Sequence, residues 1–321
     1  MKKEQLNRRE FIKSSAAVAG AALISRYARG AETTAAPSVK KTAVDQVTLG
    51  KTGIKLSRLG IGTGTNSGNV QRNLGHEAFN KLIKYAYDQG ITYIDTAEAY
   101  QTHTWVAEAI KVIPREKLFI QSKISAMGGR GRMGRGGAAQ APANNVEKIE
   151  GFLKELGVEY IDSLLVHVQT MPNWDEQNKQ LLEDLDKAKE KGYIHSHGVS
   201  THSLVATTRA ASLEWVNVNL VRINPQGVNM DSASTAVFSQ SSESDVSAVV
   251  EQLKIMRKNG HGIIGMKLVG EGAFREIEQR KKALTWVMQS DIVDAVVIGM
   301  KSKEEIDEAI KHINEAFAEK A

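Results

Sequence analysis

Three consecutive apolar segments of this sequence are each followed by residues that can move a proton or bind an oxygen atom. Asp95 comes directly after the segment 91–94, and Tyr100 lies five residues further along. Lys123 follows the next apolar segment, and His167 follows the one after that. Residues at the carboxyl ends of the parallel strands of a barrel share its catalytic face. We therefore expect these four side chains to meet around a single pocket.

These four residue types suit the transfer of hydride to a carbonyl group. A tyrosine hydroxyl, with a pKa of about 10, is a poor acid near neutrality unless a neighbouring cation stabilises its phenolate. Lys123 can supply that cation, and the carboxylate of Asp95 would keep the lysine charged inside a cleft. His167 can donate a hydrogen bond to the substrate oxygen and orient the carbonyl. Tyr100 is thus the candidate proton donor.

The elements that must position these residues follow a regular alternation. Eight short apolar runs predict strands, and segments of helical period lie between them. The predicted strands are 59–62, 91–94, 118–121, 161–166, 194–199, 216–221, 262–266 and 295–298. A hairpin, 47–49 with 54–56, precedes them. Eight strand-helix repeats predict an α/β fold, a closed (β/α)8 TIM barrel. The alternative is an open doubly wound sheet, but the turn 60–64 lacks the GxGxxG spacing.

Length allows one large domain or two small ones, and the composition is that of a soluble globular protein. The 321 residues are 41% hydrophobic and 25% charged, and there is no cysteine, which excludes disulfides and thiolate metal sites. We expect no metal site at His195, His197 and His202, because their motif has no carboxylate or cysteine beside it. Of the 42 basic and 37 acidic residues, seven and two lie in residues 1–30, which leaves 35 of each. We therefore expect no nucleic-acid partner.

The amino-terminal 30 residues are predicted to be a secretory signal. Arg8-Arg9 precedes Phe11-Ile12-Lys13, an apolar stretch over 14–25 and a plausible cleavage point after Gly30. The paired arginines resemble a twin-arginine signal, so we expect the export machinery as a partner and a periplasmic or otherwise exported location. The apolar stretch is shorter than the roughly 20 residues of a permanent membrane anchor. Residues 31–46 are predicted to be a linker, and 47–321 the barrel.

Over about residues 47–321 the sequence resembles the aldo-keto reductase family. The resemblance rests on four segments: Lys55-Leu56-Ser57-Arg58-Leu59-Gly60-Ile61-Gly62-Thr63, Tyr93-Ile94-Asp95-Thr96-Ala97-Glu98-Ala99-Tyr100, Lys191-Gly192-Tyr193-Ile194 with Gly198-Val199-Ser200, and Ala283-Leu284-Thr285-Trp286-Val287. It implies a catalytic tetrad of Asp95, Tyr100, Lys123 and His167, and NAD(P)H-dependent reduction of a small aldehyde or ketone.

The resemblance also implies a set of cofactor contacts. Gly62 and Thr63 would lie near the nicotinamide ribose and Ser200 at the carboxamide, and Asp95 would also contact the cofactor. Arg222 stands at the next cofactor-facing position, and the expected stacking aromatic is absent from Ile223-Asn224-Pro225-Gln226. The remaining residues would bind phosphates: Lys267, Leu268, Gly270 and Gly272 the pyrophosphate, Lys301 and Ser302 the 2′-phosphate. This favours NADP, with NAD possible, although Thr201 and Ala309 replace the family's usual asparagines.

Other features leave alternatives open. The arginine-rich segment 128–137 is either a lid over the site or a surface loop, and Trp174 either lines the substrate pocket or packs a loop. The chain ends soon after its last predicted helix, which predicts a broad, open site. The missing aromatic and an exported, cofactor-poor location raise a second hypothesis. In it, the protein is an exported nicotinamide-cofactor-binding sensor or interaction subunit with vestigial activity.

Overall fold

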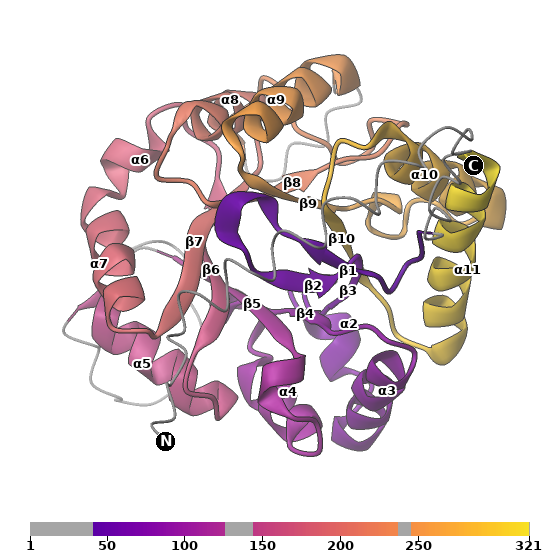
Figure 1. Cartoon of the computed structure of the whole chain (residues 1–321), viewed down its shortest axis with the longest axis horizontal. Coiled ribbons are helices and arrows are strands. Elements are labelled where there is room, and N and C mark those ends of the chain that lie inside the picture. The colour runs from indigo at the N-terminus through magenta and orange to yellow at the C-terminus, as the bar shows by residue number, and fades with distance from the viewer. Residues whose placement is uncertain (1–40, 126–143, 237–244, 321) are drawn as a thin grey trace, which may run out of the picture. The chain divides into compact units, whose positions relative to one another are not determined.

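The computed structural model describes residues 41–125, 144–236 and 245–320. Within these residues, eight parallel strands close into a barrel in the order β10-β3-β4-β5-β6-β7-β8-β9, with helices around it (Figure 1). The predicted (β/α)8 barrel is thereby confirmed. The predicted signal peptide, most of the linker and the arginine-rich segment 128–137 lie outside the described residues. None of the helices described is long and apolar enough to cross a membrane.

Each predicted strand overlaps one that is observed. The barrel strands are β3 (Leu59–Gly62), β4 (Tyr93–Asp95), β5 (Phe119–Ile124), β6 (Ile161–Gln169), β7 (Ile194–Thr201), β8 (Val218–Arg222), β9 (Gly262–Met266) and β10 (Ala295–Gly299). Three predicted starts were wrong, because Ile91-Thr92, Leu118 and Val216-Asn217 precede their strands. Asp95 is the last residue of β4, and Lys123 and His167 lie one and two residues before the ends of β5 and β6, so all three lie at the carboxyl ends of their strands.

Helices follow most strands and cover the outside of the barrel (Figure 1). They are α2 (Asn69–Arg72), α3 (His76–Asp88), α4 (His103–Ile110), α5 (Asn145–Leu156), α6 (Trp174–Gln177), α7 (Lys179–Glu190), α8 (Leu204–Ser212), α9 (Val246–Asn259), α10 (Ile277–Ser290) and α11 (Lys303–Lys320). Local signals set their ends. The side chain of Asn144 caps α5 by accepting the Glu147 N–H at 2.9 Å. Gly157 then ends this helix in the left-handed conformation.

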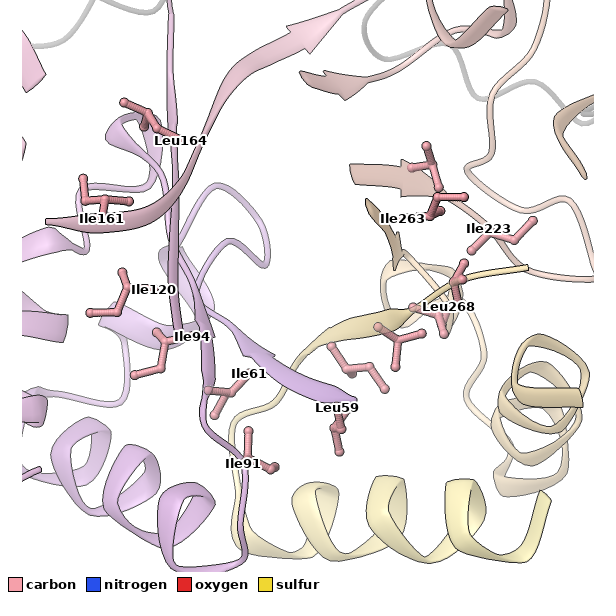
Figure 2. Close-up of a cluster of buried hydrophobic side chains, with 14 of the residues drawn as sticks. Leu59, Ile61, Ile91, Ile94, Ile120, Ile161, Leu164, Ile223, Ile263 and Leu268 are labelled. Atoms are coloured by element: carbon pink, nitrogen blue, oxygen red, sulfur yellow. The ribbon is translucent and has the colours of Figure 1, made fainter. Parts of the chain in front are cut away.

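The apolar side chains form two cores, one on each side of the barrel wall. The outer core lies between strands and helices, and Figure 2 shows part of it, including Ile94, Ile120 and Leu164. The inner core includes Tyr93, Phe119 and Leu165. Alternate residues of a strand face opposite sides, and accordingly β4, β5, β6, β8, β9 and β10 supply both cores, whereas β3 and β7 supply apolar side chains to the outer core alone. Trp174 belongs to the outer core and is fully buried, which makes it a packing residue.

The predicted hairpin is present and contributes to the inner core. It consists of β1 (Gln46–Thr48) and β2 (Lys55–Ser57), joined through the turn η1 (Gly50–Thr52). Leu49 and Leu56 of this segment are buried in the inner core, and the Lys51 N–H donates to the carbonyl of Gly260 at 2.9 Å. The hairpin lies across the barrel in Figure 1. It closes the end at which the strands begin, so the opposite end is left for chemistry.

The last residues of the predicted linker, 41–46, have defined structure. Ala43 is fully buried in the outer core. Its N–H donates to the side chain of Asn314 at 2.8 Å, and its carbonyl accepts the N–H of Leu59 at 2.8 Å. This segment therefore connects the first barrel strand to the last helix.

We expect Gly198→Ala to destabilise the barrel. A Cβ at this position in β7 would overlap the carbonyl oxygen of Val218 in β8, and backbone atoms of a paired strand cannot move aside without breaking the pairing. The free energy of unfolding, measured with urea, should fall by about 3 kcal/mol. Gly151→Ala in α5 is the control, since its Cβ would meet no atom within 4 Å. Equal stability of the two variants would contradict the expectation.

Candidate active site

A buried ion pair lies at the centre of the site. Lys123 Nζ is 2.7 Å from both carboxylate oxygens of Asp95 and donates to the carbonyl of Thr96 at 2.9 Å. The two strands that carry the pair are neighbours, with Asp95 opposite Gln121. The Gln121 side chain adds a hydrogen bond to Asp95 at 2.9 Å. The three N–H donors of the lysine therefore all have acceptors.

The pair keeps Lys123 charged although its side chain is only 1% exposed. Burial disfavours the ammonium, but the Asp95 carboxylate and Tyr100 outweigh it, so the pKa of Lys123 lies above its ordinary value. The sequence-based expectation that Asp95 would keep this lysine protonated is in line with this direction.

Tyr100 lies over this ion pair. It ends the short helical turn η2 (Glu98–Tyr100), and its ring centroid is 4.8 Å from Lys123 Nζ and 5.6 Å from the centroid of the His167 ring. Burial raises the pKa of the Tyr100 phenol above its ordinary value, and the opposing charge of Lys123 does not reverse this. Lys123 does act to lower this pKa, as the sequence predicts, but burial is the larger effect, so the phenol stays protonated at neutral pH.

His167 completes the group and is uncharged. Burial, with the nearby charge of Lys123, lowers the pKa of His167 to about 3, so its ring can donate only one hydrogen bond at neutral pH. The next residue, Val168, has a φ of 52°, a conformation that β-branched residues rarely adopt. The β6–β7 register shifts between Val166 and Gln169. This bulge changes the direction of the strand at the histidine.

Three contacts that the sequence did not predict hold Tyr100 in place. A Cβ on Gly64 would overlap the phenol ring, so only glycine lets this loop approach so closely. Arg72 of α2 donates to the carbonyl of Tyr100. The carboxylate of Glu98, two residues earlier, accepts the N–H of Ser125 at 3.3 Å. Each contact joins segments far apart in the sequence, and so no local pattern could have indicated it.

A buried cluster of hydroxyl groups lies behind Tyr100. Thr102 Oγ1 is 2.8 Å from both Thr63 Oγ1 and Thr96 Oγ1, and Thr63 also donates to the carbonyl of Asp95 at 3.0 Å. His103 follows, with one ring nitrogen 2.8 Å from Ser122 Oγ, next to Lys123. The side chain of Thr63, predicted to contact the cofactor, is therefore engaged within the protein.

The other residues predicted near the nicotinamide differ in whether their side chains already have hydrogen-bond partners within the protein. Gly62 lies opposite Asp95 in the β3–β4 pairing. Ser200 is buried, and its hydroxyl makes no hydrogen bond with the part of the chain described. Arg222, at the end of β8, is bound by its own neighbours. Its Nε is 2.5 Å from Asp231 Oδ1, and its Nη2 donates to the carbonyl of His202.

The predicted phosphate-binding residues lie in two places. Leu268 is buried in the outer core, while Lys267, Gly270 and Gly272 all have φ between 57° and 89°. Lys267 Nζ contacts Glu271 at 2.6 Å. Lys301 and Ser302 precede α11. There the Lys301 N–H donates to Glu305 at 2.8 Å, and the Ser302 hydroxyl accepts the N–H of Glu305 at 3.4 Å.

The histidines of β7 have separate partners. His195 lies 3.8 Å from Asp162, and His197 lies 3.0 Å from Asp186. Within the residues described, no group of three histidine, aspartate or glutamate residues could hold a metal ion.

Comparison with known proteins gives a family match. A family model, Aldo/keto reductase family, matches residues 58–283. The chain is 29% identical over 167 residues to the NADH-specific methylglyoxal reductase of Escherichia coli K12, covering 48% of this chain and 51% of that enzyme. It is 31% identical over 165 residues to the aldo-keto reductase YhdN of Bacillus subtilis strain 168, covering 50% and 48%. The chain thus spans about half the length of the curated relatives it matches.

A solved structure of the same fold is the aldo-keto reductase AKR11C1 of Bacillus halodurans in its holo form. The TM-score is 0.62 at 15% identity, and the match covers 87% of this chain and 96% of that one. This likeness concerns the fold alone.

We expect acid to destabilise the protein partly through His167. Its pKa falls from about 6.5 in the unfolded chain to about 3 in the fold, so the unfolded state binds more protons between these values. Stability is therefore full above pH 6.5 and is lost as the pH falls towards 3. Between pH 7 and pH 5 the wild type should lose about 2 kcal/mol more than His167→Asn in urea unfolding. Equal losses in both proteins would contradict the low pKa.

Proposed function

Because this protein belongs to the aldo/keto reductase family, we propose that it is an NAD(P)H-dependent reductase of aldehydes or ketones with Tyr100 as its proton donor. The observation that carries the proposal is a protonated, partly buried phenol next to a buried ammonium. The substrate would be a small carbonyl compound. A 2-oxoaldehyde is a reasonable first candidate, since one similar protein is named a methylglyoxal reductase.

The electrostatics of the site support Tyr100 as an acid used only during the reaction. Its raised pKa keeps the hydroxyl protonated at neutral pH. A nicotinamide cofactor, when bound, would supply hydride for the carbonyl carbon. Tyr100 would give its proton to the carbonyl oxygen, which yields the alcohol. The phenolate that remains lies beside Lys123, whose charge Asp95 maintains. The cation thus stabilises the charge as it develops.

His167 would bind the substrate oxygen without supplying a proton. Its low pKa keeps it neutral, so that one ring nitrogen donates a hydrogen bond and positions the carbonyl next to Tyr100. Positioning of this kind lowers the entropic cost of the reaction.

The residues around the mouth fit a nicotinamide cofactor. A buried hydroxyl without a partner costs free energy unless a ligand completes it, and Ser200 has such a hydroxyl, which suits a carboxamide. Lys267 offers an ammonium for phosphate. The exposed Lys301, with the Ser302 hydroxyl, would bind a 2′-phosphate, so we propose NADP as the usual cofactor. NADH should be tested beside it.

Arg222 favours a second candidate, a cofactor-binding sensor or interaction subunit with vestigial activity. Its guanidinium is held by Asp231 and His202 at a position where the family usually contacts the cofactor. A sensor would retain the cofactor tightly, show no turnover with any carbonyl compound, and co-purify with a partner. Native mass spectrometry of the exported protein would reveal both cofactor and partner.

We expect Tyr100→Phe to lower kcat for carbonyl reduction by at least about 100-fold, because it removes only the transferred proton. NADPH binding, measured by protein fluorescence, should be unchanged. Tyr193→Phe is the matched control, since its hydroxyl donates to Glu150 at 3.0 Å, outside the tetrad. A Tyr100→Phe protein with full activity would refute the assignment.

We also propose export by the twin-arginine route, on the basis of Arg8-Arg9 and the apolar stretch after it. Replacing both arginines by lysine keeps the charge but removes the guanidinium groups, so the protein should accumulate in the cytoplasm. Cell fractionation with an antibody to the chain measures this. An unchanged distribution would argue against the route.

A further inference from the structure

The loop predicted to bind the pyrophosphate, residues 267–272, contains a carboxylate, that of Glu271. Lys267 Nζ lies 2.6 Å from Glu271 Oε2, four residues further along. The side chain of Lys267 is 21% exposed and that of Glu271 is 39% exposed. The pair is therefore partly shielded from water, yet a solute at the mouth can reach both groups.

We propose that Glu271 is an internal anion that occupies Lys267 in the free protein and is displaced when a cofactor phosphate binds there. The inference rests on the proposed function, in which Lys267 binds phosphate. A carboxylate and a phosphate both accept the same N–H donors of an ammonium. While Glu271 holds the lysine, the phosphate must compete with it, and Glu271 thereby sets the affinity for the cofactor.

The backbone of the loop is held independently of this pair. The Asn224 side chain donates to the carbonyl of Lys267 at 3.3 Å, and the Asn229 side chain donates to the carbonyl of Gly270 at 3.1 Å. The ion pair can therefore open through side-chain rotation while these hydrogen bonds keep the loop in place.

The conformation of Glu271 fits a specific side-chain role. Its φ is 55°, between Gly270 and Gly272, which also have positive φ. Glycine adopts this conformation without strain, whereas a residue with a Cβ does so at a cost. A glutamate is thus held where a third glycine would fit more easily, and its contact with Lys267 offsets part of that cost.

Glu271 also makes a small contribution to the electrostatics of Tyr100. Burial is the main reason that the pKa of Tyr100 is raised, and the charge of Glu271 adds to the effect.

The test is the affinity of the full-length chain for NADPH, measured by titration calorimetry without substrate. Glu271→Gln keeps the size of the side chain and removes its charge, so NADPH should bind about three- to five-fold more tightly. The matched control is Glu251→Gln in α9, where Glu251 pairs with Lys254 at the same distance of 2.6 Å. Its affinity should equal that of the wild type.

A double variant tests whether Glu271 acts through Lys267. In a Lys267→Gln background, Glu271→Gln should give little further gain, because the shared cation is gone. The inference is overturned if Glu271→Gln leaves the affinity unchanged or weaker, or if its gain persists in full without Lys267. The proposed function fails separately, through a wild type that binds neither NADPH nor NADH.

Discussion

The buried ion pair of Lys123 and Asp95 is the constraint on which the site depends. Each residue comes from a different strand, so the β4–β5 pairing must be in register for the charges to meet at 2.7 Å. Removing either partner would leave a buried charge uncompensated, which would lower the free energy of unfolding by about 3–5 kcal/mol. The pair is thus weak evidence for stability but a strong restriction on geometry. The phenol of Tyr100 therefore lies next to an ammonium whose position is fixed.

The position of Tyr100 follows from this restriction. The segment that carries the phenol is tied on both sides of the lysine, by Glu98 to Ser125 and by His103 to Ser122. Gly64 then leaves the ring just enough room. These contacts place the phenol of Tyr100 relative to the ammonium of Lys123. In the proposed reaction they would matter alongside the four side chains themselves, because a misplacement of about 1 Å can reduce a rate a hundred-fold.

The sequence predicted what depends on periodicity, and missed what depends on burial and distant contacts. The strands, though not their exact bounds, could be located from apolar runs, and the four candidate side chains followed from them. The sequence could not predict whether the pKa of Tyr100 is raised or lowered. Burial raises it and Lys123 lowers it, and the balance depends on the three-dimensional structure. The bulge at Val168 and the partner of Arg222 were also missed. Neither the backbone angle of Val168 nor the contact of Arg222 with Asp231 produces a periodic pattern in the sequence.

Burial also decides which charges at the mouth can respond to a ligand. Arg222 and Asp231 are 4% and 0% exposed, and Asp231 accepts a further hydrogen bond from Thr207 at 2.6 Å. Neither this pair nor Lys123–Asp95 can exchange partners, because the charge left behind would have no solvent around it. Lys267 and Glu271 are several times more exposed, so water can solvate Glu271 once it leaves the lysine. Of these three pairs, only this one combines a charge that a phosphate needs with a low cost of releasing it.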